Sequence, residues 1–584
     1  MRMSEALRIA GVVAAITGVD LEERGLAWMP TLTGDRQMVL ATDTVMFDGQ
    51  EVVAILAEDR YSAADAAAAV EIDYEPLPPV VDAQAALQPG AAIVRPDRDP
   101  TSNRIWHWEN GDAAAAARSF DSAAVKVQQD FIMPRVHGAA IETIGCVASW
   151  DSEAKHLTLW ASTHTPQVTE SVLGTAASHL GITPQNITIH DPDIGGAAGS
   201  KVLTSPGYVL AAYGSLITGR PVKWIEDRIA YLKSEGYGGD YRISAEAAAT
   251  PDGQIQAIRV KTITDRGYAN AGVDPTAMPE DLYPVAPTPY ALKAMHIAVD
   301  AVYTNKPPAG IAYRRTLRVT DSVFATERLV DTLAHTIGVD PATLRLQNFV
   351  GPASADGSTP DHARALERAM ARIGYWDLRR EQAERRARGE LIGIGVGSAM
   401  EILRAGPSRV LNIQAMRSLQ GATRHKTPDA TYPFGSQVCV VDIDRETGRI
   451  TVRRFVGVHG SGDVKQQRAL VTEVYGPMAG GFAPAMLEAV TYDDQGTNVT
   501  SSFLDYLLAT AVETPRWEFE QAYEGIDGGG DKHNPGEVPT VVGQVALVNA
   551  VVDALWHLGV RNVEIPMTPA RIWRMLQANR ALSS

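Results

Sequence analysis

Hydrophobic and polar residues alternate along the first part of the chain in patterns that predict a small α/β unit. Residues 11–17 and 51–59 have the apolar character of buried strands, and the alanine-rich residues 61–70 predict a helix. A further strand is expected at residues 71–82 and a short helix at 83–87. The pattern therefore predicts a first domain over residues 1–87.

The next part of the chain predicts a larger domain of mixed strands and helices. Residues 88–104 are rich in Pro, Asp and Arg and are expected to form a linker, and the domain is expected to occupy residues 104–355. Its predicted elements are a hairpin at 145–162, helices at 165–182 and 206–219, a strand over 186–196 that runs into a glycine-rich loop, and a core helix at 321–337 that places Phe324, Leu329, Val330, Leu333 and Ile337 largely on one face.

The C-terminal part predicts a second large domain over residues 360–584. Residues 436–460 form a strong hairpin pattern with its turn at 444–449, and two apolar helices are expected at 540–559 and 568–580. A charge-rich helix at 377–390 is expected to present a solvated face. Residues 405–435 have weak periodicity and join two well-patterned regions. The fold class is thus mixed α/β with three domains.

Composition excludes several classes of function. The 584 residues carry a net charge of −16, which argues against nucleic-acid binding because that requires a basic face. The two cysteines, Cys146 and Cys439, are too few for a disulfide framework or a four-thiolate metal site. We therefore expect a cytoplasmic protein with no iron–sulfur cluster of its own.

The N-terminus resembles a signal peptide superficially, because arginines precede the apolar run from Ile9 to Ile16. Glu5 in the basic region and a poor cleavage site favour a first strand instead. No uncharged apolar run reaches the length of about 18 residues that suggests a membrane helix, so no membrane span is expected.

Three segments contain residues that could carry chemistry. In "DIGGAAGSK", Gly195, Gly196 and Gly199 follow a predicted strand, so their backbone N–H groups could converge on an anion. A tight turn between a strand and a helix is the alternative interpretation.

The other two segments are charged. In "AYRRTLR", arginines at 314, 315 and 318 surround Tyr313, and they could bind a phosphate or carboxylate, or pair with the protein's own acids. In "HNPGEVPT", Glu537 could be a general base or an acidic residue that stabilises the start of the following helix.

Taken in order, these segments resemble a known family. "WMPTLTGD", "PRVHGAAIETIGCVASWD", "DIGGAAGSK", "GRPVKWIEDR", "NKPPAGIAYRRTLRVTDSVFATERLVDTLA", "SFLDYLLATAVETP" and "NAVVDALWHLGVRNVEIPMTPARIW" resemble the molybdenum-binding large subunits of the xanthine oxidase family, and within it the large chains of aerobic carbon monoxide dehydrogenases. The resemblance covers nearly the whole chain and is far more specific than any one motif.

The resemblance implies a hammerhead-like N-terminal domain followed by two molybdopterin-binding domains, with a molybdenum–molybdopterin cytosine dinucleotide between them. It implies an iron–sulfur small subunit and an FAD medium subunit as electron-accepting partners, a small-molecule substrate, and a dimer of heterotrimers. Glu537 matches the family's catalytic base. The positions that match cofactor-binding motifs are Gly195, Gly196, Ala197, Ala198, Gly199, His164, Tyr313, Arg314, Arg315, Arg318 and Gly536.

The sequence also departs from the family pattern. Ala197 and Ala198 replace a Gly and a Phe, and Arg315 replaces the cysteine that holds copper in carbon monoxide dehydrogenases, so we expect no copper. His164 and His533 stand where the family has Gln and Lys. The chain is expected to begin part-way into the usual first domain.

A further departure concerns a cofactor motif, Gln-Gly-x-Gly-Gln, which is missing between about residues 416 and 427. Its loss would leave buried polar groups in need of new partners. Two alternatives to an active subunit therefore stay open. The chain could be a binding or assembly protein without cofactor, or one half of a split subunit.

Overall fold

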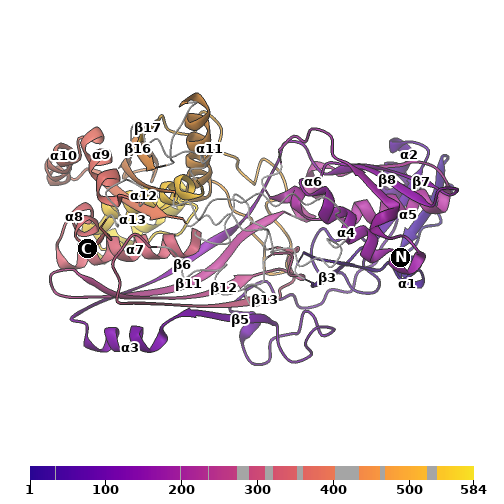
Figure 1. The fold of residues 1–584 in the computed structure, drawn as a ribbon, viewed down its shortest axis with the longest axis horizontal. Coiled ribbons are helices and arrows are strands. Elements are labelled where there is room, and N and C mark those ends of the chain that lie inside the picture. Colours follow the sequence, from indigo (N-terminus) through magenta and orange to yellow (C-terminus); the bar gives the residue numbers. More distant parts are fainter. Residues whose placement is uncertain are drawn as a thin grey trace.

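The computed structural model describes residues 1–32, 34–196, 199–234, 236–272, 288–309, 320–351, 360–401, 433–460, 467–522 and 536–583. Figure 1 shows an elongated molecule, with the N-terminal elements at one end and the C-terminal helices at the other. Long strands from the middle of the sequence run between the two ends.

The N-terminal unit contains two small sheets and two helices. Strand β1 (Val12–Thr17) pairs antiparallel with β4 (Val53–Ala57), and β2 (Trp28–Pro30) pairs with β3 (Arg36–Met38). Helix α1 (Gly18–Glu23) follows β1 and α2 (Arg60–Ala68) follows β4. The interpretation of the first apolar run as a strand is therefore confirmed.

The strand expected at residues 71–82 is wrong. Residues 72–82 form no regular element, and prolines at 76, 78 and 79 lack the N–H group that a paired strand must donate. Tyr74 and Leu77 are exposed, at 60% and 63%, so this stretch buries little apolar surface. The helix expected at 83–87 is a short 3₁₀ turn, Ala85–Leu87.

Residues 88–103 of the expected linker lack helix and strand, and residue 104 already begins β5, but the segment is anchored to the protein. The guanidinium of Arg95 is buried, donates to Asp97 at 2.7 Å and lies over the rings of Trp28 and Tyr268. The expected linker is therefore a packed strap between the N-terminal unit and the next domain.

A four-stranded sheet carries the predicted glycine-rich loop. Its order is β10 (Val222–Ile225), β7 (Gly145–Asp151), β8 (His156–Ala161) and β9 (Ile187–His190), with β8 and β9 parallel. Helices α4 (Pro166–Ala176) and α5 (Pro206–Thr218) share its core, and α6 (Arg228–Ser234) follows β10. The β7–β8 hairpin and both helices agree with the sequence prediction.

A five-stranded sheet forms the long middle of the molecule. Its order is β5 (Arg104–Gly111), β13 (Ala294–Val302), β12 (Ile255–Asp265), β11 (Tyr237–Ala249) and β6 (Val125–His137). Helix α3 (Ala113–Ser122) covers one face, and α7 (Thr320–Ile337) covers the other, as Figure 1 shows. Helix α8 (Pro341–Asn348) follows. The prediction of a core helix is confirmed, because Phe324, Leu329, Val330 and Leu333 are all buried.

The C-terminal part is built on a second four-stranded sheet. Its order is β14 (Leu391–Met400), β15 (Phe434–Ile443), β16 (Ile450–Gly460) and β17 (Trp517–Gln521). Ile392, Ile394 and Val396 of β14 belong to the core formed with α9 (His362–Ile373). The opposite face packs on α12 (Val538–Leu555), which contacts α11 (Gln467–Met486), and α13 (Pro569–Ser583) closes the chain.

Helix α12 and the turn after it, Val538–Leu558, would be long and apolar enough to cross a membrane. All of its apolar window is buried inside the protein, which is also the property of a core helix.

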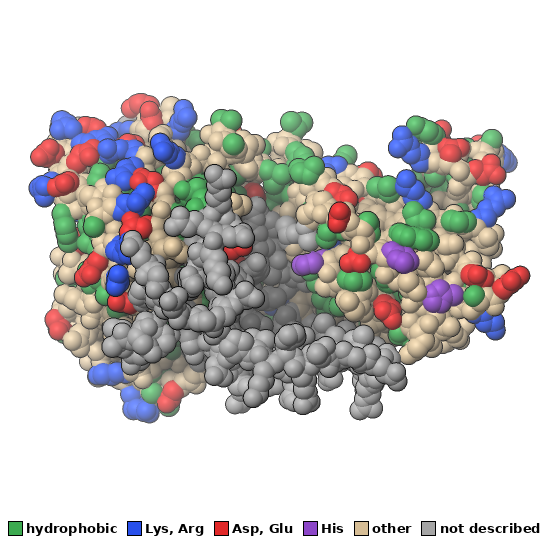
Figure 2. All heavy atoms as spheres, turned by 45° about the horizontal axis from the view of Figure 1, so that its top comes forward, with side chains coloured by type: hydrophobic (Ala, Val, Ile, Leu, Met, Phe, Trp, Pro, Cys, Tyr) green, Lys and Arg blue, Asp and Glu red, His purple; other side chains and the backbone are tan. Residues whose placement is uncertain are grey.

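Helix α10 (Tyr375–Ala387) differs from the expected solvated helix. Arg379 and Gln382 donate to the buried carboxylate of Asp553 in α12, at 3.1 and 2.6 Å. Figure 2 shows Lys and Arg intermixed with Asp and Glu over the end of the molecule that carries α9 and α10. Some polar side chains of α10 therefore bind the helix to the core, in addition to those that face solvent.

Candidate functional site

The glycine-rich loop after β9 lies against a buried lysine and a glutamate. The ammonium group of Lys201 donates to the carboxylate of Glu142, which also accepts the backbone N–H of Gly195 at 2.7 Å. Although burial favours the neutral acid, these two donors hold the pKa of Glu142 below its usual value. The loop therefore binds one carboxylate through backbone and ammonium donors, as an anion-binding loop does.

Glycine is required at the described positions of this loop. Gly196 and Gly199 both have φ of +88°, a conformation that side chains disfavour. A Cβ atom at Gly195 would lie 2.7 Å from the Cβ of Glu142. Ala197 and Ala198, which were also predicted to contact a cofactor, lie outside the described residues.

The structure brings His164 to the same loop. His164 follows β8, and its backbone N–H donates to the carbonyl of Lys201 at 2.8 Å, while the hydroxyl of Thr165 donates to the carbonyl of Val202 at 2.8 Å. Because β8 and β9 are parallel, their carboxyl ends meet at one edge of the sheet, which is where ligands bind in open α/β sheets. His164 is exposed at that edge.

Buried aromatic residues support the far side of the loop. The hydroxyl of Ser200 lies 2.5 Å from that of Tyr231, whose ring contacts His137 edge to face. Burial raises the pKa of Tyr231, so its hydroxyl stays protonated. Tyr506, from the C-terminal half, accepts the backbone N–H of His137 at 2.8 Å and so connects the two halves behind the loop.

Gly536 and Glu537 lie at the start of α12. Glu537 is 5% exposed and occupies the N-cap position, yet its side chain accepts no hydrogen bond from the first turn of the helix. Its backbone N–H instead donates to the carboxylate of Glu401 at 2.8 Å. The side chain of Glu537 therefore makes no capping hydrogen bond, but its position at the start of α12 still suits an acidic residue stabilised by the helix dipole, so both interpretations of Glu537 stay open.

Glu401 is a residue that the sequence interpretation missed. It directly follows β14, whose sequence from 393 to 397 places a glycine at every second position. A run of glycines on one face of a strand indicates that another backbone packs closely against that face. This pattern could therefore have directed attention to Glu401, which follows the strand.

The charge next to the predicted arginine cluster is paired within the protein. Lys306 lies 3.0 Å from Asp240 and 2.9 Å from Asp265, and Arg135 lies 2.8 Å from Asp240. Although burial opposes it, these cations lower the pKa of Asp240. Tyr313, Arg314, Arg315 and Arg318 themselves, like His533, lie outside the described residues.

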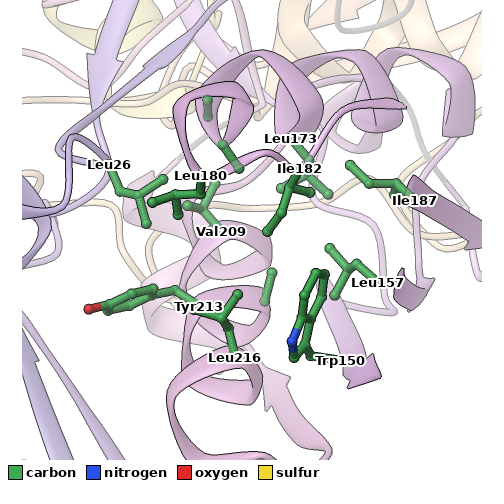
Figure 3. A pocket seen from close by; sticks show the side chains of 13 residues that line it. Leu26, Trp150, Leu157, Leu173, Leu180, Ile182, Ile187, Val209, Tyr213 and Leu216 are labelled. Carbon is green, nitrogen blue, oxygen red and sulfur yellow. The ribbon is translucent and has the colours of Figure 1, made fainter. Parts of the chain in front are cut away.

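Two cavities differ in character. Figure 3 shows an apolar one of about 440 Å³ beside α4 and α5, lined by residues such as Trp150, Leu157 and Val209. Such a lining offers no charged group and indicates packing space within the core. A smaller cavity of about 200 Å³ is lined mainly by apolar atoms, although most of its lining residues have polar side chains, namely Thr288, Ser322, Thr326, Glu327 and Ser398. Its remaining wall includes Val323, which packs with Val538 beside Glu537.

The described candidate residues thus form two clusters. One contains His164, the glycine loop and Lys201, and the other contains Gly536, Glu537 and Glu401. In the part of the chain that the structure describes, no group of three or more His, Cys, Asp or Glu side chains could hold a metal ion. The first cluster fits a nucleotide cofactor through close backbone approach, because Gly195, Gly196 and Gly199 carry no side chains, whereas the charge of the buried Lys201 is balanced by Glu142.

Comparison with known families agrees with this architecture. Residues 1–78 match the "Aldehyde oxidase and xanthine dehydrogenase, a/b hammerhead domain" family. Residues 96–349 and 411–515 match two families that are each described as "Molybdopterin cofactor-binding domain". The glycine loop and His164 lie inside the first of these two matches.

Individual relatives are similar over almost the whole chain. The carbon monoxide dehydrogenase large chain of Hydrogenophaga pseudoflava is 31% identical, covering 98% of this chain and 91% of the relative. That alignment spans 738 positions against the 584 residues of this chain, so the relative has insertions that this chain lacks.

Solved structures give the same result. Reconstituted CO dehydrogenase from Oligotropha carboxidovorans superposes with a TM-score of 0.91 at 30% identity, covering 100% of this chain and 92% of that one. Quinoline 2-oxidoreductase from Pseudomonas putida 86 shares the fold, with a TM-score of 0.84 at 22% identity. The chain therefore belongs to the xanthine oxidase family of molybdenum hydroxylase large subunits and is similar over almost its whole length to carbon monoxide dehydrogenase large chains.

Proposed function

We propose that this chain is the catalytic large subunit of a molybdopterin-dependent hydroxylase, which oxidises a small carbonyl compound or heterocycle with water as the oxygen source. The cofactor is a molybdopterin cytosine dinucleotide without copper, because Arg315 stands where a copper-binding cysteine would be needed. When bound, this group supplies the two-electron oxidation of the substrate.

The observation that carries the proposal is the placement of Glu537. Its carboxylate belongs to a residue that is 5% exposed at the start of a buried helix, and it is not used to cap that helix. A buried carboxylate that is held in place by its own backbone can accept and release a proton at its Oε atoms, which is the requirement for a general base.

The other cluster would hold the cofactor. Gly195, Gly196 and Gly199 carry no side chains and would let the backbone approach the nucleotide closely, while the Lys201–Glu142 pair holds the loop in place. His164, exposed at the same edge, would lie beside the bound group. The carboxylate of Glu142 holds the side chain of Lys201 in position.

The proposed partners are an iron–sulfur small subunit and an FAD medium subunit, in a cytoplasmic dimer of heterotrimers. The two cysteines of the sequence are both buried and offer no exposed thiolate pair for a cluster, so electrons would need another chain. The segment around Tyr506 exposes apolar side chains that suit a protein interface, with Leu504 and Val512 both 89% exposed.

Metal and cofactor analysis of the purified protein tests the proposal. We expect about one molybdenum and one pterin nucleotide per chain. A Glu537→Gln variant should keep both and lose turnover, whereas Glu488→Gln, which changes another buried carboxylate, should keep turnover. Absence of molybdenum despite cofactor supply would favour a binding protein without cofactor, and copper beside molybdenum would contradict the role given to Arg315.

A further inference from the structure

Strand β14 and helix α12 are in direct backbone contact. A Cβ atom at Gly393 would lie 1.8 Å from the carbonyl oxygen of Ala550, and one at Gly395 would lie 2.1 Å from that of Ala546. Only glycine therefore permits this approach, and the side of β14 that carries these glycines rests on the helix without intervening side chains.

The register of this contact continues to the start of the helix. Two residues of a strand rise by roughly 6.6 Å and four residues of a helix by roughly 6 Å, so alternate strand residues meet successive helical turns. After Gly397, which faces Val542 and Val545, Ala399 packs with Val538 and Val541. The next residue on this face is Glu401.

Glu401 contacts the backbone directly before α12. Its carboxylate oxygen accepts the N–H of Glu537 at 2.8 Å, and a Cβ atom at Gly536 would lie 2.3 Å from the same oxygen. Gly536 has φ of +62°, so glycine is favoured there by conformation and by space. Glu401 itself is 5% exposed and is tied to β15 by its own N–H, which donates to the carbonyl of Pro433 at 2.8 Å.

This arrangement supplies what the start of a helix needs. The first N–H groups of a helix lack partners within the helix, and negative charge there is stabilised by the helix dipole. Glu401 supplies a carboxyl acceptor for the N–H group at the N-cap from a neighbouring strand.

We propose that Glu401 is a positioning residue, which fixes the backbone of Glu537 so that the Glu537 carboxylate is held for proton transfer. The inference rests on the proposed function, because it concerns the base of that reaction. Glu401 acts through one hydrogen bond, and β14 holds it there because the strand is locked onto α12.

Hydrogen–deuterium exchange of the Glu537 amide tests the contact without cofactor or turnover. In Glu401→Ala, the exchange of this amide should accelerate about tenfold or more, since the lost bond joins a charged acceptor to a buried donor. Glu401→Gln keeps an acceptor oxygen and should restore a large part of the protection. The matched control Glu488→Gln should leave this amide unchanged.

Kinetics of the loaded enzyme supply the second measurement. Glu401→Ala should lower kcat by about tenfold or more with KM within about twofold, and Glu401→Gln should recover part of kcat. Unchanged exchange at the Glu537 amide in a folded Glu401→Ala protein would overturn the inference, as would equal exchange and equal kcat in the two variants.

A second pair of variants covers the case in which Glu401→Ala does not fold. Gly536→Ala places a methyl group against the Glu401 carboxylate oxygen, so it should harm the wild type more than the Glu401→Asp background, where the shorter side chain withdraws that oxygen. Additive effects would contradict direct contact. If Glu537→Gln retained full turnover, the proposed function would fail, while the exchange result would still decide whether Glu401 fixes the backbone of Glu537.

Discussion

The ammonium group of Lys201 is fully buried, whereas the Glu142 side chain with which it pairs is 44% exposed. The two partners therefore differ in what their removal costs. A buried charge that loses its partner keeps its full desolvation penalty, but a half-exposed carboxylate can return to water.

We expect Glu142→Ala to destabilise the protein more than Lys201→Met. Glu142→Ala leaves a buried ammonium group without its partner and should lower the free energy of unfolding by about 3 kcal/mol. Lys201→Met should lower it by about 1 kcal/mol. Urea unfolding of both variants measures the difference. Replacement of Glu5, which pairs with Arg8 at the surface, is the control and should change little. Equal losses in the two core variants would show that the pair is not asymmetric.

The contact between β14 and α12 predicts a large effect from one methyl group. Gly395→Ala should lower the free energy of unfolding by about 3 kcal/mol, because the new Cβ atom would lie 2.1 Å from helix backbone atoms. Gly476→Ala is the matched control in α11, where a Cβ atom meets nothing within 4 Å, and it should stabilise by about 0.5 to 1 kcal/mol. A mild Gly395→Ala variant would contradict the close packing.

Acid should destabilise the protein through His459. Burial lowers the pKa of His459 from 6.5 to about 3, so between these values the unfolded chain binds a proton that the folded protein does not. The free energy of unfolding should therefore fall as pH drops from 6.5 towards 3, by up to about 1.4 kcal/mol per pH unit.

A His459→Leu variant tests this dependence, because it removes the titrating group. Its unfolding free energy, measured in urea between pH 4 and pH 7, should vary less steeply than that of the wild type. Burial also lowers the pKa of His362, to about 4, so His362 should destabilise the protein in acid as well. Part of the dependence of unfolding free energy on pH should therefore remain in the His459→Leu variant. An unchanged slope would assign the acid sensitivity to other groups.

Alkali should destabilise the protein through Glu226. Burial, with a smaller contribution from Glu51, raises the pKa of Glu226 from 4.5 to about 8. Between these values the folded protein keeps a proton that the unfolded chain has released, so stability should decline as pH rises through this window.

Glu226→Gln should remove that decline. The amide can still accept the hydroxyl of Ser234, which donates to Glu226 at 2.6 Å. Thermal unfolding at pH 6 and pH 9 should show a midpoint that falls less in the variant than in the wild type. A parallel fall in both proteins would exclude Glu226 as the cause.

Much of the fold could be predicted from the sequence, because its main elements carry strong local patterns. The hairpin at 436–460 and the core helix at 321–337 have clear periods of two and 3.6 residues, and both are present. The strand expected at 71–82 failed because its apolar residues outweighed its prolines in that prediction. A paired strand requires backbone N–H donors, and proline has none.

The candidate site was predictable only in part. Glu537 and the glycine loop were proposed from the sequence because they stand in recognisable motifs, whereas Glu401 has no motif of its own. Its role depends on a strand and a helix that lie 136 positions apart in sequence and meet only in the folded protein. Similarly, the arginine and glutamine of α10 that bind Asp553 could not be distinguished from solvated residues by charge pattern alone.

Met400 of β14 pairs with Phe434 of β15, and the N–H of Glu401 extends this pairing by donating to the carbonyl of Pro433. This pairing determines which changes in chain length the protein can tolerate between the two strands. The two strands are held by their own ladder, so the polypeptide between residues 401 and 433 leaves and returns at adjacent points. Doubling the length of such a connection costs only about 0.6 kcal/mol in closure entropy. Evolution can thus lengthen or trim the protein here by whole motifs while the strands, and the glutamate at their end, stay where they are.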